Sequence, residues 1–475
     1  MLPKRSGCSN LQRRVMIKLR ILVVIALACT AGWVQAASTN STPTQARLRS
    51  SQCAVPVTEI TELMGHIQAG AAAEWLAARD VVVHTPGEEI FLGVIHPDAA
   101  LFEKTFSLEG AINEHENFIC LLKDSGARVF RLTDILLAGT VDKDGATIQG
   151  PALQDLQQLA AKYLTYDAST LPENLRAGQE AYRQSVIKDL HPLQLIEIIL
   201  QQPSVKLTST GSHNTGFAAS YSLDPVMNMY FMRDQVITTP KGIVIGKFNA
   251  QQRNAETEIA LFAYRKLGAT PIFSVHGEGR LEGGDYIAAG DVSFQGQGLR
   301  TNQQAVSQVL ASGAYGTKRV IVVKDPWKNQ VQMHLDTYFN VISDKLAAMV
   351  EDRLDIRDRD GKLIQAANPQ KKPIADVYEL QDGVYKIVER DVPFQNYLEK
   401  LGYKILPVTP EDQLKYGLNF LTTSSNKLLA IDGVSQSYKD LLKAQGVDAV
   451  WMDFRNLTSG YGAAHCTTQV IRRAP

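Results

Sequence analysis

The sequence predicts an α/β protein with a helical insertion, and three observations indicate this fold class. From about residue 78 onward, short apolar strand patterns alternate with amphipathic helix patterns. Residues 150–202 instead carry successive helical patterns, which indicates an insertion over about residues 145–215. After residue 223, a unit of two apolar runs joined by a short turn recurs in four segments. Such recurrence is typical of architectures that repeat around an axis.

The chain begins with an export signal over residues 1–36. Lys18 and Arg20 precede an apolar run, and the segment ends at Ala36 in the small-residue pattern that a signal peptidase cleaves. Translation could also start at Met16. We therefore expect a periplasmic or secreted protein, in which residues 37–77 form a flexible lead-in and an N-terminal helix.

Composition and cysteine content limit the possible classes further. Lys plus Arg and Asp plus Glu both number 49, so the formal net charge is zero and no basic surface for nucleic acid is expected. No later segment is long and apolar enough for a membrane span. Cys29 allows a lipoprotein anchor, but Ala26-Leu27-Ala28 is a poor match to the sequence that precedes a lipidated cysteine. After cleavage, Cys53 and Cys120 are the candidate disulfide and Cys466 is left over. Three unpaired cysteines are the alternative.

The elements follow in order along the mature chain. Residues 78–87 form a short apolar strand ending in a turn, and residues 114–125 form an amphipathic helix that stops at Gly126 before another strand. Pro192 suits the first position of a helix in the insertion. Another helix of the insertion has an apolar stripe of Leu153, Leu156, Leu159 and Tyr163.

The four recurring segments are predicted hairpins, each with a polar residue at its mouth. They span residues 232–248, 283–296, 334–350 and 419–432. Three of them carry an aspartate at the mouth: Asp234, Asp285 and Asp336. If the hairpins surround one axis, these side chains meet in a pocket whose walls are the apolar runs.

Several motifs carry candidate chemistry, and each also has an ordinary structural explanation. Cys466, in SGYGAAHCTTQV, follows small residues that let a ligand approach the backbone, although a plain loop cysteine fits too. In HLDT, read as a strand, His334 and Asp336 share one face, whereas Val331, Met333 and Leu335 face the core. The histidine and the aspartate could bind a metal, exchange protons or lie on a wet surface.

The carboxylates near the glycine pair and in NMYFMRDQV leave similar alternatives. Glu282 and Asp285 flank two glycines that permit a tight turn near a ligand, or they are solvated acids of a hairpin turn. Arg233 and Asp234 could simply contact each other within a strand. A divalent metal site is conceivable, but few Cys and His ligands are present, so we expect neither a metal nor a cofactor.

Together, one thiol, one histidine and three or four carboxylates describe a nucleophile that faces a planar cation. Two carboxylates can each bind one edge of a guanidinium group. The cation would lower the thiol pKa from its usual value of about 8.5, so binding would create the nucleophile. Attack on the central carbon then gives a tetrahedral covalent adduct.

These motifs resemble the arginine deiminase family of guanidino-group-modifying enzymes. The resemblance runs from about residue 78 to the end of the chain. The matching motifs, in family order, include VVVHTPGEE, EHENFICLLKDSG, NMYFMRD, RNAETE, EGGD, GLRTN, HLDT and HCTTQ. The resemblance implies a five-bladed, pseudosymmetric α/β propeller, and the helical insertion indicates the arginine deiminase branch rather than the agmatine deiminases.

The resemblance also implies a role for individual residues. Cys466 matches the nucleophile, His334 the general acid–base and Glu282 its carboxylate partner. Asp234 and Asp336 match the two acids that grip the guanidinium.

Four further residues match the family's substrate contacts. Arg253 and Arg300 match residues that bind the α-carboxylate, Asn228 matches a further contact there and Phe231 matches a pocket wall. Phe231 has the opposite strand parity to Asp234, so the chain must turn between them. A pair of buried cations at Arg253 and Arg300 has little reason to exist without a substrate carboxylate.

The sequence departs from the family in the loop before the nucleophile. Tyr461 occupies the position of an arginine that orders this loop and holds the acidic end of the substrate in the family. The leading hypothesis is hydrolysis of L-arginine to citrulline and ammonia outside the cytoplasm, in a possible homo-oligomer. Alternatives are the same chemistry on peptidyl-arginine, agmatine or a modified arginine, an amidinotransferase, or a non-catalytic arginine binder.

Overall fold

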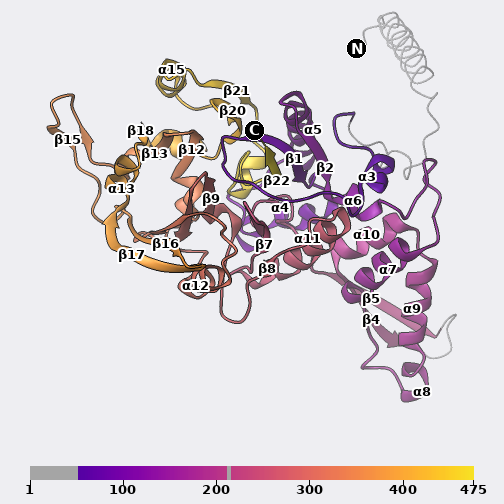
Figure 1. Cartoon of the computed structure of the whole chain (residues 1–475). Coiled ribbons are helices and arrows are strands. Elements are labelled where there is room, and N and C mark those ends of the chain that lie inside the picture. The colour runs from indigo at the N-terminus through magenta and orange to yellow at the C-terminus, as the bar shows by residue number, and fades with distance from the viewer. Residues whose placement is uncertain (1–51, 211–215, 475) are drawn as a thin grey trace, which may run out of the picture. The chain divides into compact units, whose positions relative to one another are not determined.

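The strands and helices of the computed structural model follow the predicted alternation (Figure 1). The structure describes residues 52–210 and 216–474. The predicted export signal over residues 1–36, with Met16 and Cys29, lies outside the described residues, as does the first part of the lead-in. No helix in the described ranges is long and apolar enough to cross a membrane.

Five units of the described chain share one plan: an antiparallel hairpin, a helix, and a third strand parallel to the second. The first unit consists of β22 (Gln469–Ala474), β1 (Ala77–Val83), α5 (Leu108–Asp124) and β2 (Arg128–Arg131). The second consists of β6 (Val236–Thr239), β7 (Gly242–Ile245), α11 (Asn254–Leu267) and β8 (Phe273–Ser274). The third consists of β9 (Tyr286–Ala289), β10 (Val292–Gln297), α12 (Gln303–Ser312) and β11 (Arg319–Lys324).

The last two units repeat the plan and complete a ring. The fourth consists of β12 (Phe339–Ser343), β13 (Leu346–Val350), α13 (Phe394–Lys400) and β18 (Lys404–Val408). The fifth consists of β19 (Leu421–Ser424), β20 (Lys427–Ile431), α15 (Gln436–Ala444) and β21 (Asp448–Met452). Contacts run from β22 to β6, β9, β12 and β19, and β19 contacts β1 of the first unit. This closed sequence of contacts is consistent with the five-bladed α/β propeller that the resemblance implies.

The hairpins are visible in the sequence because their strands are buried on both faces. Every residue of β6, β7, β9, β12 and β13 is buried, so these strands appear as continuous apolar runs rather than alternating ones. All four predicted hairpins are confirmed. The fifth hairpin pairs β1 with β22 from the opposite end of the chain, and Figure 1 shows the indigo and yellow strands side by side.

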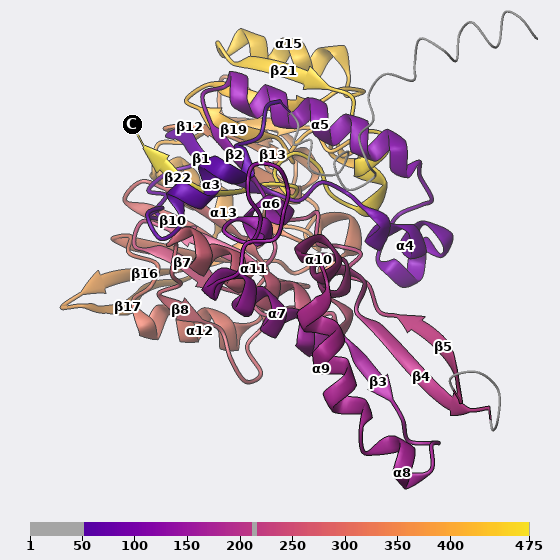
Figure 2. The ribbon, with the colours of Figure 1, turned by 90° about the vertical axis from the view of Figure 1, so that its right-hand side faces the viewer.

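The segment between β2 and β6 holds helices and an additional sheet. The helices are α6 (Leu132–Leu137), α7 (Pro151–Tyr163), α8 (Glu173–Arg176), α9 (Gln179–Asp189) and α10 (Pro192–Gln201). The sheet consists of β3 (Thr165–Asp167), β4 (Pro203–Ser209) and β5 (Phe217–Leu223), shown next to α9 in Figure 2. Pro192 lies at the start of α10, as predicted. Sequence analysis predicts only helices in this segment, so the sheet is an addition.

Smaller elements complete the described chain. They are α3 (Val57–Leu63), α4 (Phe91–Ile95), α14 (Pro410–Leu414), the β14–β15 hairpin (Ile356–Arg357 and Leu363–Gln365), β16 (Ile374–Gln381) and β17 (Val384–Pro393). β16 pairs with β11 and extends the sheet of the third unit. Cys53 and Cys120 form a disulfide that ties the segment before α3 to α5, which confirms the candidate pair. Three unpaired cysteines is therefore the wrong alternative.

Candidate active site

The mouths of the five hairpins meet in one place, and each contributes a polar residue. Asp234, Asp285, Asp336 and Asn419 lie just before β6, β9, β12 and β19. Cys466 has the corresponding position before β22. The nucleophile predicted from the sequence is thus the fifth member of a repeated set.

Hydrogen bonds connect each mouth to the next and fix these side chains relative to one another. Within the described residues the bonds form a closed circle of five. In order, Arg233 N donates to Cys466 O (3.0 Å), Gly283 N to Asp234 O (3.0 Å), Leu335 N to Asp285 Oδ1 (2.9 Å), Asn419 Nδ2 to Asp336 O (3.4 Å) and Cys466 N to Asn419 Oδ1 (3.2 Å). A circle of this kind makes the site rigid, because no mouth can move without breaking a bond on either side.

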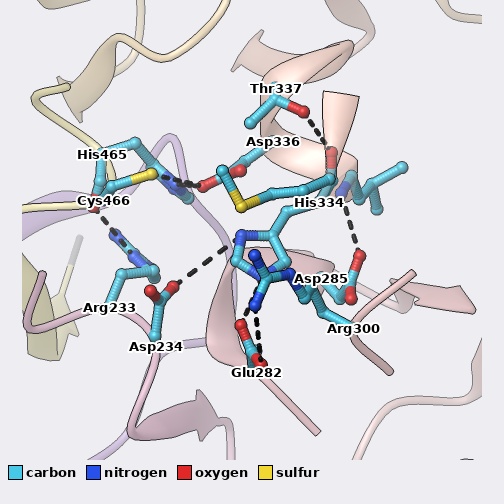
Figure 3. Close-up of polar contacts among 12 residues, drawn as sticks. Arg233, Asp234, Glu282, Asp285, Arg300, His334, Asp336, Thr337, His465 and Cys466 are labelled. Carbon is cyan, nitrogen blue, oxygen red and sulfur yellow. Dashed lines mark hydrogen bonds and ion pairs between the residues drawn. The ribbon is translucent and has the colours of Figure 1, made fainter. Parts of the chain in front are cut away.

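The Cys466 thiol is buried beside carboxylates. Its Sγ lies 3.7 Å from Asp336 Oδ2, and the two side chains point toward each other in Figure 3. Burial raises the pKa of the thiol well above its usual value, and the negative charges of Asp336 and Asp234 add to this effect. The thiol is therefore protonated at neutral pH.

His334 faces two carboxylates and is charged at neutral pH. Its Nε2 lies 3.0 Å from Glu282 Oε2, and its Nδ1 lies 3.8 Å from Asp234 Oδ1. Burial lowers the pKa of His334, but Asp234 and the hydrogen bond to Glu282 outweigh burial and raise that pKa to about 9. Burial raises the pKa of Glu282, but the hydrogen bond from His334 outweighs burial and lowers that pKa to about 2. The pair consequently holds an imidazolium and a carboxylate.

The two glycines of EGGD are required because other segments of the chain approach them closely, and not because they form a solvated turn. A Cβ atom on Gly283 would lie 2.0 Å from the carbonyl oxygen of Arg233. A Cβ atom on Gly284 would lie 2.6 Å from His334 Nδ1. These glycines therefore allow Glu282 to reach the histidine ring.

Of the buried carboxylate oxygens without a hydrogen-bond donor among the described residues, two lie beside the thiol or the imidazole. They are Asp234 Oδ1 and Asp336 Oδ1. A buried acceptor without a partner carries a desolvation cost of about 1–3 kcal/mol, and more when it is charged. Because both residues border the thiol or the imidazole, a cation with several N–H donors would satisfy them.

Arg253 and Arg300 differ in how far their charges are already matched. Arg253 donates to Glu256 (2.9 and 2.8 Å) and to Asp234 Oδ2 (2.8 Å), so the argument that it needs a substrate carboxylate is wrong. Arg300 Nη2 donates to Gln330 Oε1 (3.0 Å) and its Nη1 lies 3.9 Å from Glu282 Oε1, whereas its Nε has no partner among the residues described. Arg300 thus has the donor that an incoming carboxylate could use.

Asn228 and Phe231 line a cavity at the thiol of Cys466. The backbone turns between Phe231 and Asp234, as predicted. Phe231 N donates to Asn228 O (3.0 Å), and Asp234 N donates to Phe231 O (3.2 Å). The cavity, which Arg300, His334, Tyr461 and Cys466 also line, has a volume of about 20 Å³. This is about the space of one water molecule.

The predicted strand at HLDT is wrong. Residues Leu335–Thr337 form a short 3₁₀ helix, which follows another at Gln330–Gln332. Val331 is consequently exposed rather than buried in the core. His334 and Asp336 still face the site, but a tight helical turn brings them there instead of strand alternation.

Comparison with known proteins identifies the family. A model of the arginine deiminase family matches residues 98–473. This chain belongs to the arginine deiminase family. The arginine deiminase of Halobacterium salinarum is 25% identical over 497 residues, covering 85% of this chain and 96% of the relative. That of Rhodococcus erythropolis is 24% identical over 433 residues, covering 86% and 99%. A solved structure of DDAH from Pseudomonas aeruginosa is 12% identical, covers 82% of this chain and 98% of that chain, and has a TM-score of 0.46.

Membership of the arginine deiminase family makes this protein a hydrolase that acts on guanidino C–N bonds. Sequence analysis missed three buried residues of its site: Glu74, Asn419 and His465. Asn419 could have been found, because it opens the fourth predicted hairpin where the other three carry aspartate. Glu74 lies outside the hairpins, and no local pattern marks it.

Judged by distances alone, the site could hold a metal ion. Asp234, Glu282 and His334 offer ligand atoms within 4.8 Å of one another. However, His334 Nε2 is already bonded to Glu282, and Arg253 is paired with Asp234. The absence of a metal requirement stays a prediction.

Proposed function

We propose that the protein is an exported arginine deiminase, which hydrolyses L-arginine to L-citrulline and ammonia through a covalent intermediate on Cys466. The observation that carries this proposal is the pair of buried acceptors, Asp234 Oδ1 and Asp336 Oδ1, that lack donors among the described residues. A guanidinium group supplies planar N–H donors that both free oxygens can accept. The curated relatives are themselves arginine deiminases, which supports this substrate.

In the first half of the reaction, the bound guanidinium lowers the pKa of the Cys466 thiol, which loses its proton to water. The thiolate attacks the guanidinium carbon, and an S–C bond forms in a tetrahedral adduct. Protonated His334 gives its proton to the departing nitrogen. The C–N bond then breaks, ammonia leaves, and a thiouronium remains on Cys466.

In the second half, a water molecule replaces ammonia. His334, now neutral, accepts a proton from the water as its oxygen bonds to the thiouronium carbon. Collapse of this adduct breaks the S–C bond, and the hydroxyl proton of the adduct passes to the departing sulfur, which releases citrulline and restores the thiol. Glu282 keeps the imidazole oriented in both halves.

Export is a separate part of the proposal. The apolar segment and cleavage pattern over residues 1–36 support it, and so does the Cys53–Cys120 disulfide. Disulfides persist in oxidising compartments and are rare in the cytosol. We therefore place the protein in the periplasm or outside the cell, without a lipid anchor at Cys29.

A second candidate is the same chemistry on another guanidine, such as agmatine, peptidyl-arginine or a modified arginine. Tyr461 stands in place of the family arginine, and Arg253 is already neutralised by Glu256 and Asp234. A cavity of about 240 Å³ shares Tyr461 and Met333 with the site and could accept a larger substrate.

The deciding experiment measures citrulline formed from L-arginine by residues 37–475, with Cys466→Ala as the control. We expect turnover that the substitution abolishes. A folded protein that leaves L-arginine unchanged but converts agmatine or an arginyl peptide would establish the second candidate. Turnover that survives Cys466→Ala would exclude the covalent mechanism.

A further inference from the structure

The imidazole of His465, next to the nucleophile, contacts the carboxylate that lies beside the thiol. His465 Nδ1 is 2.7 Å from Asp336 Oδ2. The same oxygen is 3.7 Å from Cys466 Sγ. Since Asp336 accepts as a carboxylate, the proton of this hydrogen bond lies on Nδ1.

This contact spans the ring of hairpin mouths rather than joining neighbours. His465 belongs to the loop that enters the first unit, whereas Asp336 belongs to the fourth, and the fifth unit lies between them. Among the described residues, Nδ1 of His465 is the only nitrogen atom that donates to the Asp336 carboxylate. The bond engages Oδ2 and leaves Oδ1 free for a ligand (Figure 3).

Glu74 holds the opposite edge of the imidazole. Its Oε1 lies 3.8 Å from His465 Nε2, and its carboxylate pairs with Arg473 and lies 3.6 Å from Arg233 Nη1. Burial raises the pKa of Glu74, but Arg473, with His465 and Arg233 nearby, outweighs burial, so this pKa falls below its usual range. The ring is thereby fixed between a carboxylate on each side.

We propose that His465 is a positioning residue, which orients Asp336 so that its free oxygen receives the guanidinium beside Cys466. This inference rests on the proposed function for the identity of the cation. It assigns to His465 and Glu74 a role distinct from that of the acid–base His334.

The test compares two amides in place of the imidazole. In His465→Asn the side-chain N–H takes the place of Nδ1 and can still reach Asp336, whereas in His465→Gln it takes the place of Nε2. We expect His465→Asn to retain kcat/KM for L-arginine within threefold. His465→Gln should lose roughly 10- to 100-fold, the usual effect of removing a hydrogen bond to a charged group. If His465 only fills space, glutamine, the closer match in size, would perform at least as well as asparagine, and the proposal is wrong.

A second readout does not depend on turnover. Cys466 is alkylated with 2-chloroacetamidine, a planar cation, and with neutral 2-chloroacetamide, and the ratio of the two rates reports how well the carboxylates recognise a cation. We expect the ratio to fall about tenfold in His465→Gln and to stay within threefold in His465→Asn, with Asp336→Asn as the lower limit. Equal ratios in all three His465 forms would overturn the proposal.

The two readouts separate this inference from the proposed function. A wild-type protein without citrulline formation, but with the expected order of alkylation ratios, would refute the function and keep the positioning role. Should the His465 variants not fold, Glu74→Gln carries the test. Its ratio should fall about threefold, and an unchanged ratio would refute the role of Glu74 in fixing the imidazole of His465.

Discussion

Removal of the Cys53–Cys120 disulfide should cost the protein about 4 kcal/mol of stability. The two cysteines are 67 residues apart, and closing a loop of that length removes chain entropy from the unfolded state. With the loop-closure relation this corresponds to about 4.4 kcal/mol at 25 °C. A chain of 475 residues unfolds with an entropy of roughly 1 kcal/mol/K, so the expected loss in melting temperature is about 4 °C.

The assay is scanning calorimetry of the mature protein and of its Cys53→Ala/Cys120→Ala variant, with and without a phosphine reductant. Both cysteines are only partly buried, so loss of side-chain packing adds little. The reductant should lower the melting temperature of the wild type to that of the double variant and should leave the variant unchanged. A double variant that melts within 1 °C of the oxidised wild type would refute the loop-closure argument.

Three further predictions concern the reaction. His334 carries the transferable proton below its pKa of about 9 and loses it above, so kcat/KM should fall on the alkaline side near pH 9, and Glu282→Gln should move this fall to lower pH. Tyr461→Arg should lower the KM for L-arginine roughly tenfold and leave the KM for agmatine, which has no carboxylate, unchanged; equal effects on both would exclude a contact to the carboxylate. Dialysis against EDTA should leave citrulline formation unchanged, whereas a loss that Zn²⁺ or Mn²⁺ restores would assign a metal to Asp234, Glu282 and His334.

Local patterns were sufficient for the hairpins that are contiguous in sequence. Strands such as β9 and β12 are buried on both faces and separated by a short turn from their partners, so the chain displays them as paired apolar runs. The hairpin of β22 and β1 has no such signal, because Val470 and Val81 pair across nearly the whole chain. Neither strand is followed by a turn to the other.

The residues of the site likewise divide into those that a local sequence pattern marks and those that it does not. Asp234, Asp285 and Asp336 are recognisable because each opens a local hairpin, and the family motifs add roles to them. The predicted alternation of side chains along a strand at His334 was wrong, because the backbone forms 3₁₀ turns there. Glu74 reaches His465 only through tertiary structure, and its segment carries no periodic pattern.

The circle of hydrogen bonds has a consequence for the order in which this protein matures. Cys466 lies just before β22, so the other four mouths emerge from the ribosome before the thiol does. Pairing β22 with β1 is a contact of very long sequence separation, which makes it a slow step of folding. If the protein is exported as proposed, Cys466 crosses the membrane after the other four mouths. Proteolytic removal of residues 466–474 would remove the thiol, break the circle and expose the edge of β1 in a single event.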